Sequence, residues 1–180
     1  MHITNIKCHT QLTAESLSKL SERINTKSSS ISKRTHSFAV IRLNSYVYTC
    51  FYSGFLNITG IKGYDFIEDA ILKLSIFLNI DEKQSYKYNT PVIDCMSAHW
   101  SKNNLLSRHN LSEIIELSKE DSRIIGVKYN RQRFPALFLK TNFGTVLWFS
   151  TPTISAVGLK TREDLLSIRE IITQILCKLK

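Results

Sequence analysis

Apolar residues recur along this chain with two spacings, and each spacing predicts a type of secondary structure. Alternating apolar positions rich in β-branched and aromatic residues predict strands, and a spacing of three to four predicts helices. The predicted strands are Ile3–Thr10, Phe38–Leu43, Tyr46–Tyr52, Val92–His99, Ile124–Tyr129, Ala136–Leu139 and Thr145–Phe149. The predicted helices are Ala14–Ile24, Tyr64–Leu78, Leu111–Lys119 and Arg162–Cys177, with Thr13 and Asn110 as caps for the two shorter ones. This order favours an α+β fold with helices on one face of an antiparallel sheet.

The chain also repeats itself. The stretch from His36 to Lys62 aligns without a gap with the stretch from Phe134 to Lys160, at a constant shift of 134 − 36 = 98 positions. The matching pairs are Asn44 with Asn142, Phe51 with Phe149, Gly60 with Gly158 and Lys62 with Lys160, and apolar positions such as Ile41 and Leu139 also coincide. We therefore expect two pseudo-symmetric halves, 1–80 and 81–180, in one combined domain. The polar segment 81–89 is the expected link between them, and 101–109 is an expected surface loop.

Composition narrows the class of partner. With 180 residues and 43% hydrophobic content the chain can form its own core. It has 24 Lys and Arg against 15 Asp and Glu, a net charge of +9, which favours a polyanionic partner such as nucleic acid. We find neither a signal-peptide core nor a segment long enough to span a bilayer, and we expect no membrane partner.

The sequence offers little catalytic chemistry. The four cysteines (Cys8, Cys50, Cys95 and Cys177) lie far apart, which indicates reduced thiols rather than disulfides or zinc ligands. The histidines lack metal-ligand spacing, and the six glycines are too few for a phosphate-binding loop. We expect no enzymatic activity, no metal and no cofactor.

Several segments resemble the TATA-box-binding protein family. Phe134–Lys140, Val146–Phe149 and Val157–Lys160 are similar to the second repeat of that family, and Ile3–Ile6 and Phe51–Lys62 to the first. The resemblance implies a saddle, in which a curved antiparallel sheet grips DNA with its concave face and helices on the convex face are left for protein partners. Phenylalanine pairs at the ends of the sheet wedge into base steps and kink the duplex.

The resemblance assigns roles residue by residue. Phe134 and Phe149 match one wedge pair, with Pro135 and Leu147 beside them, and Phe51 matches the inner wedge of the first repeat. Its partner is His36 by the constant shift or Phe38 as the nearest aromatic residue. Asn5 and Thr59 match groups that bind base edges in the minor groove. The remaining predicted DNA contacts are Lys7, Asn57, Asp94, Met96, Ser155 and Val157.

Some of these positions depart from the family. Asp94 or Cys95 stands where the family has asparagine, and Val157 stands where it has threonine. An aspartate offers no donor to minor-groove acceptors, so the symmetric readout is expected to be lost on that side. Lys7 replaces an apolar residue, as do Asn57 and Ser155, and a lysine there is expected to loosen sequence choice and raise the salt dependence.

Two surfaces are expected to bind protein partners. Arg131 and Arg133 stand where the family has an acidic loop that meets general transcription factor IIB, so this contact is expected to be altered, or the two arginines contact phosphates or solvent. Leu72, Ile76 and Ile80 form an apolar stripe on the outer side of the helix Tyr64–Leu78, which either binds a partner or is covered by the chain itself. The predicted core face of that helix comprises Phe66, Ile67, Ala70, Ile71, Leu74, Phe77 and Leu78.

The leading hypothesis is a transcription initiation factor that binds and bends A·T-rich promoter DNA through the minor groove. Its expected partners are double-stranded DNA, transcription factors of the IIB or IIA type or altered counterparts, and the RNA polymerase machinery. The rival hypothesis is a protein-interaction paralogue with little or no specific DNA binding. The expected compartment is the nucleus, or a cytoplasmic factory if the protein is viral.

Overall fold

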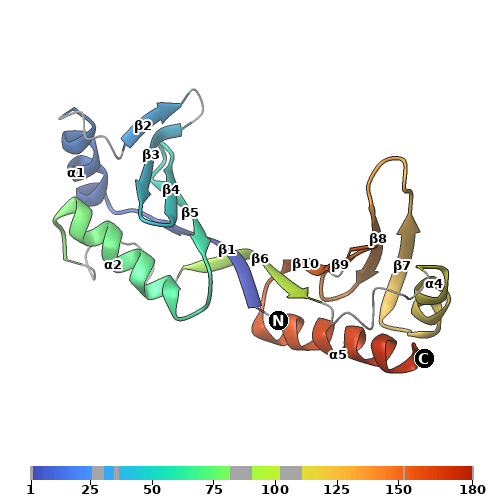
Figure 1. The fold of residues 1–180 in the computed structure, drawn as a ribbon. Helices are drawn as coiled ribbons and strands as arrows, with labels where there is room; N and C mark the ends of the chain where they lie inside the picture. The colour runs from blue at the N-terminus through green and yellow to red at the C-terminus, as the bar shows by residue number, and fades with distance from the viewer. Residues whose placement is uncertain are drawn as a thin grey trace. The chain divides into compact units, whose positions relative to one another are not determined.

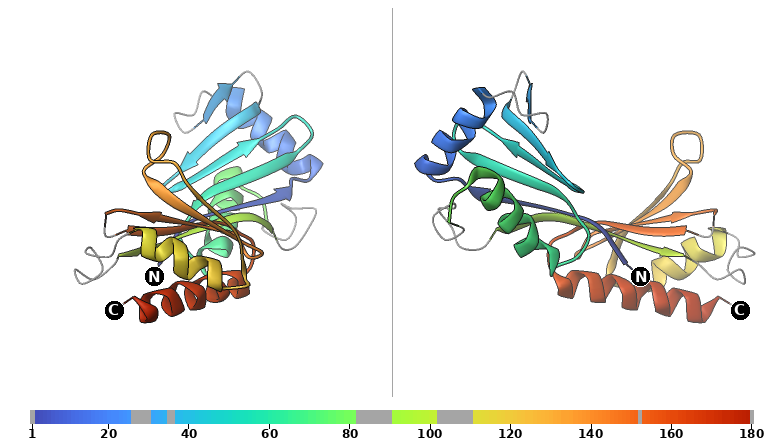
Figure 2. Two further views of the ribbon diagram at one scale, coloured as in Figure 1. Left: turned by 90° about the vertical axis from the view of Figure 1, so that its right-hand side faces the viewer. Right: turned by 60° about the vertical axis from the view of Figure 1, so that its left-hand side comes forward.

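A computed structural model describes residues 2–25, 31–34, 37–81, 91–101, 111–151 and 153–179. The chain forms two compact units, which we call the N-terminal unit (Thr4–Asp94) and the C-terminal unit (Cys95–Lys180 with Met1–Ile3) (Figure 1). In each unit the helices cover one face of an antiparallel sheet, so the predicted α+β class is confirmed (Figure 2). The predicted division into 1–80 and 81–180 stays a prediction, because residues 82–90 lie outside the described part.

In its described residues the N-terminal unit has five strands in the order β2-β3-β4-β5-β1, with antiparallel neighbours. The strands are β1 (His2–Gln11), β2 (Ile31–Arg34), β3 (Ser37–Leu43), β4 (Tyr46–Cys50) and β5 (Phe55–Ile61). The helices are α1 (Ala14–Asn25) and α2 (Phe66–Leu78). The buried Tyr48 hydroxyl donates to the Ala70 carbonyl oxygen of α2 at 2.7 Å, which identifies the helix-covered face of the sheet. Because side chains alternate along a strand, the neighbours of Tyr48 on β4, Val47 and Thr49, lie on the opposite, helix-free face.

The C-terminal unit repeats this layout, with strand order β6-β10-β9-β8-β7. The strands are β6 (Val92–Ser101), β7 (Ile124–Tyr129), β8 (Ala136–Thr141), β9 (Thr145–Phe149) and β10 (Thr153–Leu159). The first three residues of β6, up to Asp94, belong to the N-terminal unit. The helices are α4 (Leu111–Glu120) and α5 (Arg162–Lys178). The core lies between helices and sheet, where α5 buries Leu165, Ile168, Ile171, Ile172 and Ile175. The helix α5 begins with a capping box in which Thr161 and Asp164 bind each other's backbone N–H groups.

The strand register confirms the internal repeat at the predicted shift. On the helix-free face of the N-terminal unit, one row across the strands runs Val40, Thr49, Asn57 and His9. In the C-terminal unit the corresponding row runs Phe138, Leu147, Ser155 and His99. The first three members of each row are 98 positions apart (138 − 40 = 98), as in the alignment of the sequence.

Both halves also share a β-bulge. Ile6 and Cys8, two residues apart on β1, pair with Ile61 and Ile58, three residues apart on β5, so β5 carries one extra residue. The pairing between β6 and β10 has the same irregularity, between Ala156 and Leu159. A glycine with positive φ lies in each bulge, Gly60 at 86° and Gly158 at 79°. Such bulges bend the strand and re-aim neighbouring side chains.

Most predicted elements are confirmed, with differences of a few residues at their ends, but three strands were missed. β2 is polar, β5 contains Asn57 and Gly60, and β10 is built largely from small residues, so their intrinsic strand propensity is low. Neighbouring strands impose the extended conformation there.

Residues 82–89 of the predicted link and 102–109 of the predicted loop lie outside the described residues, as does the predicted cap Asn110. Thr13 caps α1 as predicted, since its Oγ1 accepts from the Ser16 N–H at 3.3 Å.

The interpretation of α2 needs one correction. The helix begins at Phe66 rather than Tyr64, and Phe66 was predicted to lie in the core but is 50% exposed. Phe66 is the first residue of the helix, so it precedes the turns that pack on the sheet. The buried residues of α2 are Ala70, Ile71, Leu74, Ser75 and Leu78.

Candidate nucleic-acid interface

The helix-free face of the N-terminal unit carries most of the polar residues predicted to contact bases. Asn5 and Thr59 lie there on β1 and β5, next to the bulge at Gly60. The Gly60 N–H donates to Asn5 Oδ1 at 2.7 Å, and the Thr59 hydroxyl donates to the Val47 carbonyl oxygen at 3.5 Å. The bulge therefore fixes the Asn5 amide against the backbone, with its oxygen engaged. Asn57, also predicted, lies half-buried between Thr49 and His9 in the row described above.

A charged cluster lies on the same face, where Lys7 and His9 alternate with the buried residues of β1 and their side chains contact Asp94 at the start of β6. The Asp94 Oδ1 atom is 2.6 Å from His9 Nδ1, and its Oδ2 atom is 3.6 Å from Lys7 Nζ. An ionised carboxylate can only accept, so the imidazole Nδ1–H donates in this contact. Lys7 and Asp94, which were predicted separately, are thus brought together by His9, which the sequence did not single out. We name Lys7, His9 and Asp94 the charged triad.

Aromatic rings gather at one end of this face. The Phe51 ring lies 6.1 Å from the Phe55 ring, and the Phe55 ring stacks on His9 at 4.9 Å. Phe51 is half-buried, and Phe55 was missed as its neighbour. Of the two proposed partners for Phe51, His36 lies outside the described residues, and Phe38 lies on β3.

The helix-free face of the C-terminal unit carries the second predicted group. Leu147 lies beside Ser155 in the register, and Val157 pairs with Thr145, so all of these residues share that face. Each of them is partly exposed. In the row of residues across the helix-free face, the N-terminal unit has Thr49 and Asn57 where the C-terminal unit has Leu147 and Ser155. The face of the N-terminal unit is therefore the more polar of the two at these positions.

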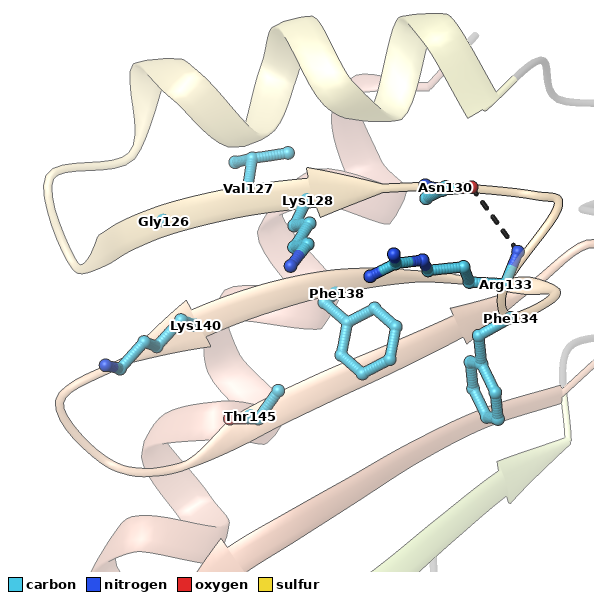
Figure 3. Close-up of a pocket in the computed structure, with 9 residues that line it drawn as sticks. All are labelled: Gly126, Val127, Lys128, Asn130, Arg133, Phe134, Phe138, Lys140 and Thr145. Atoms are coloured by element: carbon cyan, nitrogen blue, oxygen red, sulfur yellow. Dashed lines mark hydrogen bonds between the residues drawn. The ribbon is translucent and has the colours of Figure 1, made fainter.

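The predicted wedge pair is assembled at the end of this face. The ring centroids of Phe134 and Phe149 lie 5.9 Å apart. The Phe138 ring lies 5.4 Å from that of Phe134, and Figure 3 shows these two side chains. Phe134 is 40% exposed although it is a large apolar residue. Pro135, beside it, is exposed as well. An aromatic cluster with an exposed ring, on the helix-free face of a sheet, is a surface that can meet flat apolar groups.

Basic side chains line a cavity next to this cluster. The cavity has a volume of about 480 Å³ and is bounded by Phe134 and Phe138 together with Lys128, Arg133 and Lys140 (Figure 3). Lys128 pairs with Phe138 across the strands, which places both on the helix-free face. Sequence reasoning missed Phe138, Lys128 and Lys140, although the period-two alternation through β7 and β8 contains the signal. Aromatic faces flanked by cations suit nucleic acid, because bases stack and phosphates attract lysine and arginine.

One predicted contact residue is wrong. Met96 is fully buried and pairs with the equally buried Leu159 on the helix-covered face. It belongs to the core between β6, β10 and the helices, and it cannot contact a ligand. The resemblance correctly made this segment a strand of the sheet, but side-chain alternation along β6 directs Met96 toward the core.

The predicted partner surfaces are exposed to different degrees. Arg131 and Arg133 lie exposed in the turn between β7 and β8, held by Asn130, whose side-chain oxygen accepts from the Arg133 N–H at 3.3 Å. On α2, Leu72 is 44% and Ile76 is 67% exposed, whereas Ile80 beyond the helix is only partly exposed. These side chains lie on the outer surface of their unit.

Titratable groups shift mainly through burial and local pairing. Burial raises the pKa of the Cys8 and Cys50 thiols to about 12, with the Asp94 charge adding to the effect at Cys8. In the structure all four cysteines are free. Burial of Tyr46, assisted by a 2.6 Å hydrogen bond from its hydroxyl to Asp69, also raises the pKa of Tyr46 to about 12.

Within the described residues, no group of three or more His, Cys, Asp or Glu side chains is placed to hold a metal ion. No helix in the described ranges is long and apolar enough to cross a membrane.

Comparison with solved structures identifies the fold. The chain superimposes on the TBP of Methanococcus jannaschii with a TM-score of 0.70 and 22% sequence identity, over 98% of both chains. The fold is therefore that of the TATA-box-binding proteins, as the sequence resemblance implied. No protein-family model matches the sequence, and no curated protein does.

Proposed function

We propose that this chain is a DNA-binding transcription factor that grips and bends duplex DNA through the minor groove with its helix-free sheet faces. The observation that carries this proposal is the Phe134–Phe149 pair on a helix-free face, in which Phe134 is exposed and Phe149 is half-buried, with ring centroids 5.9 Å apart and basic residues beside it. An apolar wedge inserted between base steps partly unstacks them and kinks the duplex. The overall charge of +9 supplies long-range attraction to the phosphates.

Each unit has a part in this proposal. In the C-terminal unit, Phe134 and Phe149 enter a base step while Lys128 and Lys140 meet phosphates. In the N-terminal unit, Phe51 is the matching wedge, and Asn5 and Thr59 lie at the base edges. The fold likeness to a TBP supports this assignment. A DNA-bound chain would recruit further transcription proteins through its helices and the turn at Arg131 and Arg133.

The test is a fluorescence-based measurement of binding and bending on a short duplex with an A·T-rich or a G·C-rich centre. The variant is Phe134→Ala with Phe149→Ala. We expect the wild-type protein to bend the duplex and the double variant to lose the bend while keeping part of its salt-dependent affinity. The matched control is Phe66→Ala on α2, because Phe66 is 50% exposed but lies at the start of a helix. Binding without a bend by the wild-type protein, or no binding at moderate salt, would refute the proposal.

A second function, a protein-interaction module, is favoured by the exposed apolar side chains of α2. Leu72 and Ile76 are exposed one helical turn apart, and Phe66 is exposed at the start of the helix. The direct test is titration of a IIA-type or IIB-type factor from the same source with the wild-type protein and with Leu72→Ser plus Ile76→Ser. Tight binding that the double variant loses, together with no DNA bending, would establish the second function instead of the first.

A further inference from the structure

A carboxylate stands among basic groups on the helix-free face of the N-terminal unit, and this placement has a consequence for base recognition. Asp94 is held by His9 at 2.6 Å and by Lys7 at 3.6 Å. The side chains are partly exposed, 27% for Asp94, 29% for His9 and 43% for Lys7. The carboxylate is therefore both fixed in place and accessible from outside.

The minor groove constrains what such a group can bind. A·T and T·A pairs present only acceptors there, whereas a G·C pair adds one donor, the exocyclic 2-amino group of guanine. A carboxylate accepts hydrogen bonds and donates none, so it is repelled by an A·T pair and matched by a G·C pair. Its two oxygens provide about four acceptor positions, and the hydrogen bond from His9 uses one of them, while Lys7 forms an ion pair at 3.6 Å.

Neighbouring groups offset the electrostatic cost of placing a carboxylate near DNA. A lone Asp94 would be repelled by the phosphates, but the Lys7 ammonium offsets that charge and the His9 Nδ1–H donates to the carboxylate. In the unbound protein the same two groups restrict the orientation of the carboxylate, which lowers the conformational cost of recognition. The Asp94 carboxylate is thus held in an orientation in which it can accept a hydrogen bond from one donor.

We propose that Asp94 accepts a hydrogen bond from the 2-amino group of a guanine, so that this chain selects a G·C pair at one position of its DNA site. The inference rests on the proposed function, since it requires the helix-free face to meet the minor groove. Lys7 and His9 act as positioning residues for Asp94. The DNA site is then A·T-rich where the phenylalanines insert and contains one G·C pair where the charged triad lies.

Inosine provides the decisive probe, because an I·C pair differs from a G·C pair in the minor groove only by lacking the 2-amino group. A set of duplexes carries one G·C pair at successive positions of an A·T tract, and a second set carries I·C at the same positions. We expect wild-type protein to bind G·C about tenfold more tightly than I·C at one position and with equal affinity elsewhere. We expect Asp94→Asn to abolish this preference, because an amide also offers a donor to the inosine and thymine acceptors.

The matched control is Asp65→Asn, which removes the same charge from an exposed N-cap whose side chain makes no capping hydrogen bond. This variant should keep the G·C to I·C ratio of the wild-type protein. Thermal melting of both variants separates loss of folding from loss of recognition. The ratio of the affinities for the G·C and I·C duplexes does not depend on what fraction of the protein is folded and active. If the wild-type protein binds the duplexes with no G·C to I·C difference at any position, or if Asp94→Asn keeps the difference, the inference is overturned while the proposed function stands. If it binds no duplex, both fail.

Discussion

The two bulge glycines provide a sharp test of how the repeat is built. Gly60 and Gly158 have nearly the same positive φ, 86° and 79°, and occupy equivalent positions in the two units. Their surroundings differ. A Cβ atom built on Gly60 would lie 2.1 Å from the Ser45 carbonyl oxygen, whereas a Cβ atom on Gly158 would meet nothing within 4 Å. Alanine at each position therefore separates backbone strain from steric overlap.

The magnitudes follow from these two effects. A residue with a side chain loses roughly 1–2 kcal/mol in the left-handed region. Alanine recovers about 0.4–1 kcal/mol by lowering the entropy of the unfolded chain. Gly158→Ala should thus lower the free energy of unfolding by about 1 kcal/mol. Gly60→Ala carries the same strain plus an overlap with backbone that cannot rotate away, which adds roughly 1–3 kcal/mol. We expect a total loss of about 2–4 kcal/mol.

The assay is urea unfolding of wild-type protein and both variants, followed by circular dichroism. We expect the midpoint of Gly60→Ala to fall well below that of Gly158→Ala, with little change in the slope of either transition. The Gly60 N–H also donates to Asn5, so Gly60→Ala should weaken DNA binding by displacing that amide. Equal losses of stability in the two variants would refute the reasoning, because it would show that the contact with Ser45 is relieved at no cost.

Three further predictions concern other parts of the chain. Thr161→Ala removes the capping box of α5 and should cost about 0.5–2 kcal/mol of stability, measured by urea unfolding against Thr173→Ala as an exposed control in the same helix. Burial raises the pKa of the Cys50 thiol from 9.0 to about 12, so at pH 8 a thiol reagent should modify the exposed Cys177 quickly and Cys50 only in urea. Between about pH 9 and pH 12 the unfolded chain releases this proton while the folded chain keeps it, so stability should fall as pH rises; fast labelling of Cys50 in the folded protein would contradict its burial. Lys128→Ala with Lys140→Ala should lower the slope of log affinity against log salt by about 2, and an unchanged slope would show that neither side chain meets a phosphate.

The sequence by itself determined the elements and their repetition. Period-two and helical spacing located most strands and all four described helices, because side-chain alternation depends only on local geometry. The shift of 98 positions aligned Gly60 with Gly158 and Phe51 with Phe149, and the strand register bears out the alignment of the rows. The pairing of Phe134 with Phe149 was likewise predictable from the resemblance of their segments to a known family.

Only the tertiary structure decided which side chains meet. Asp94 and Lys7 are 87 positions apart (94 − 7 = 87), and no local pattern shows that His9 and Lys7 hold the same carboxylate. The strands β5 and β10 are extended because their neighbours hydrogen-bond to them, an effect that single-residue propensity does not contain. Met96 lies in the core because its strand alternates inward there, and Phe66 is exposed because the helix starts later than its apolar spacing indicates. Local spacing fixes the period of a segment, whereas the face that a residue presents depends on the packing of distant segments against it.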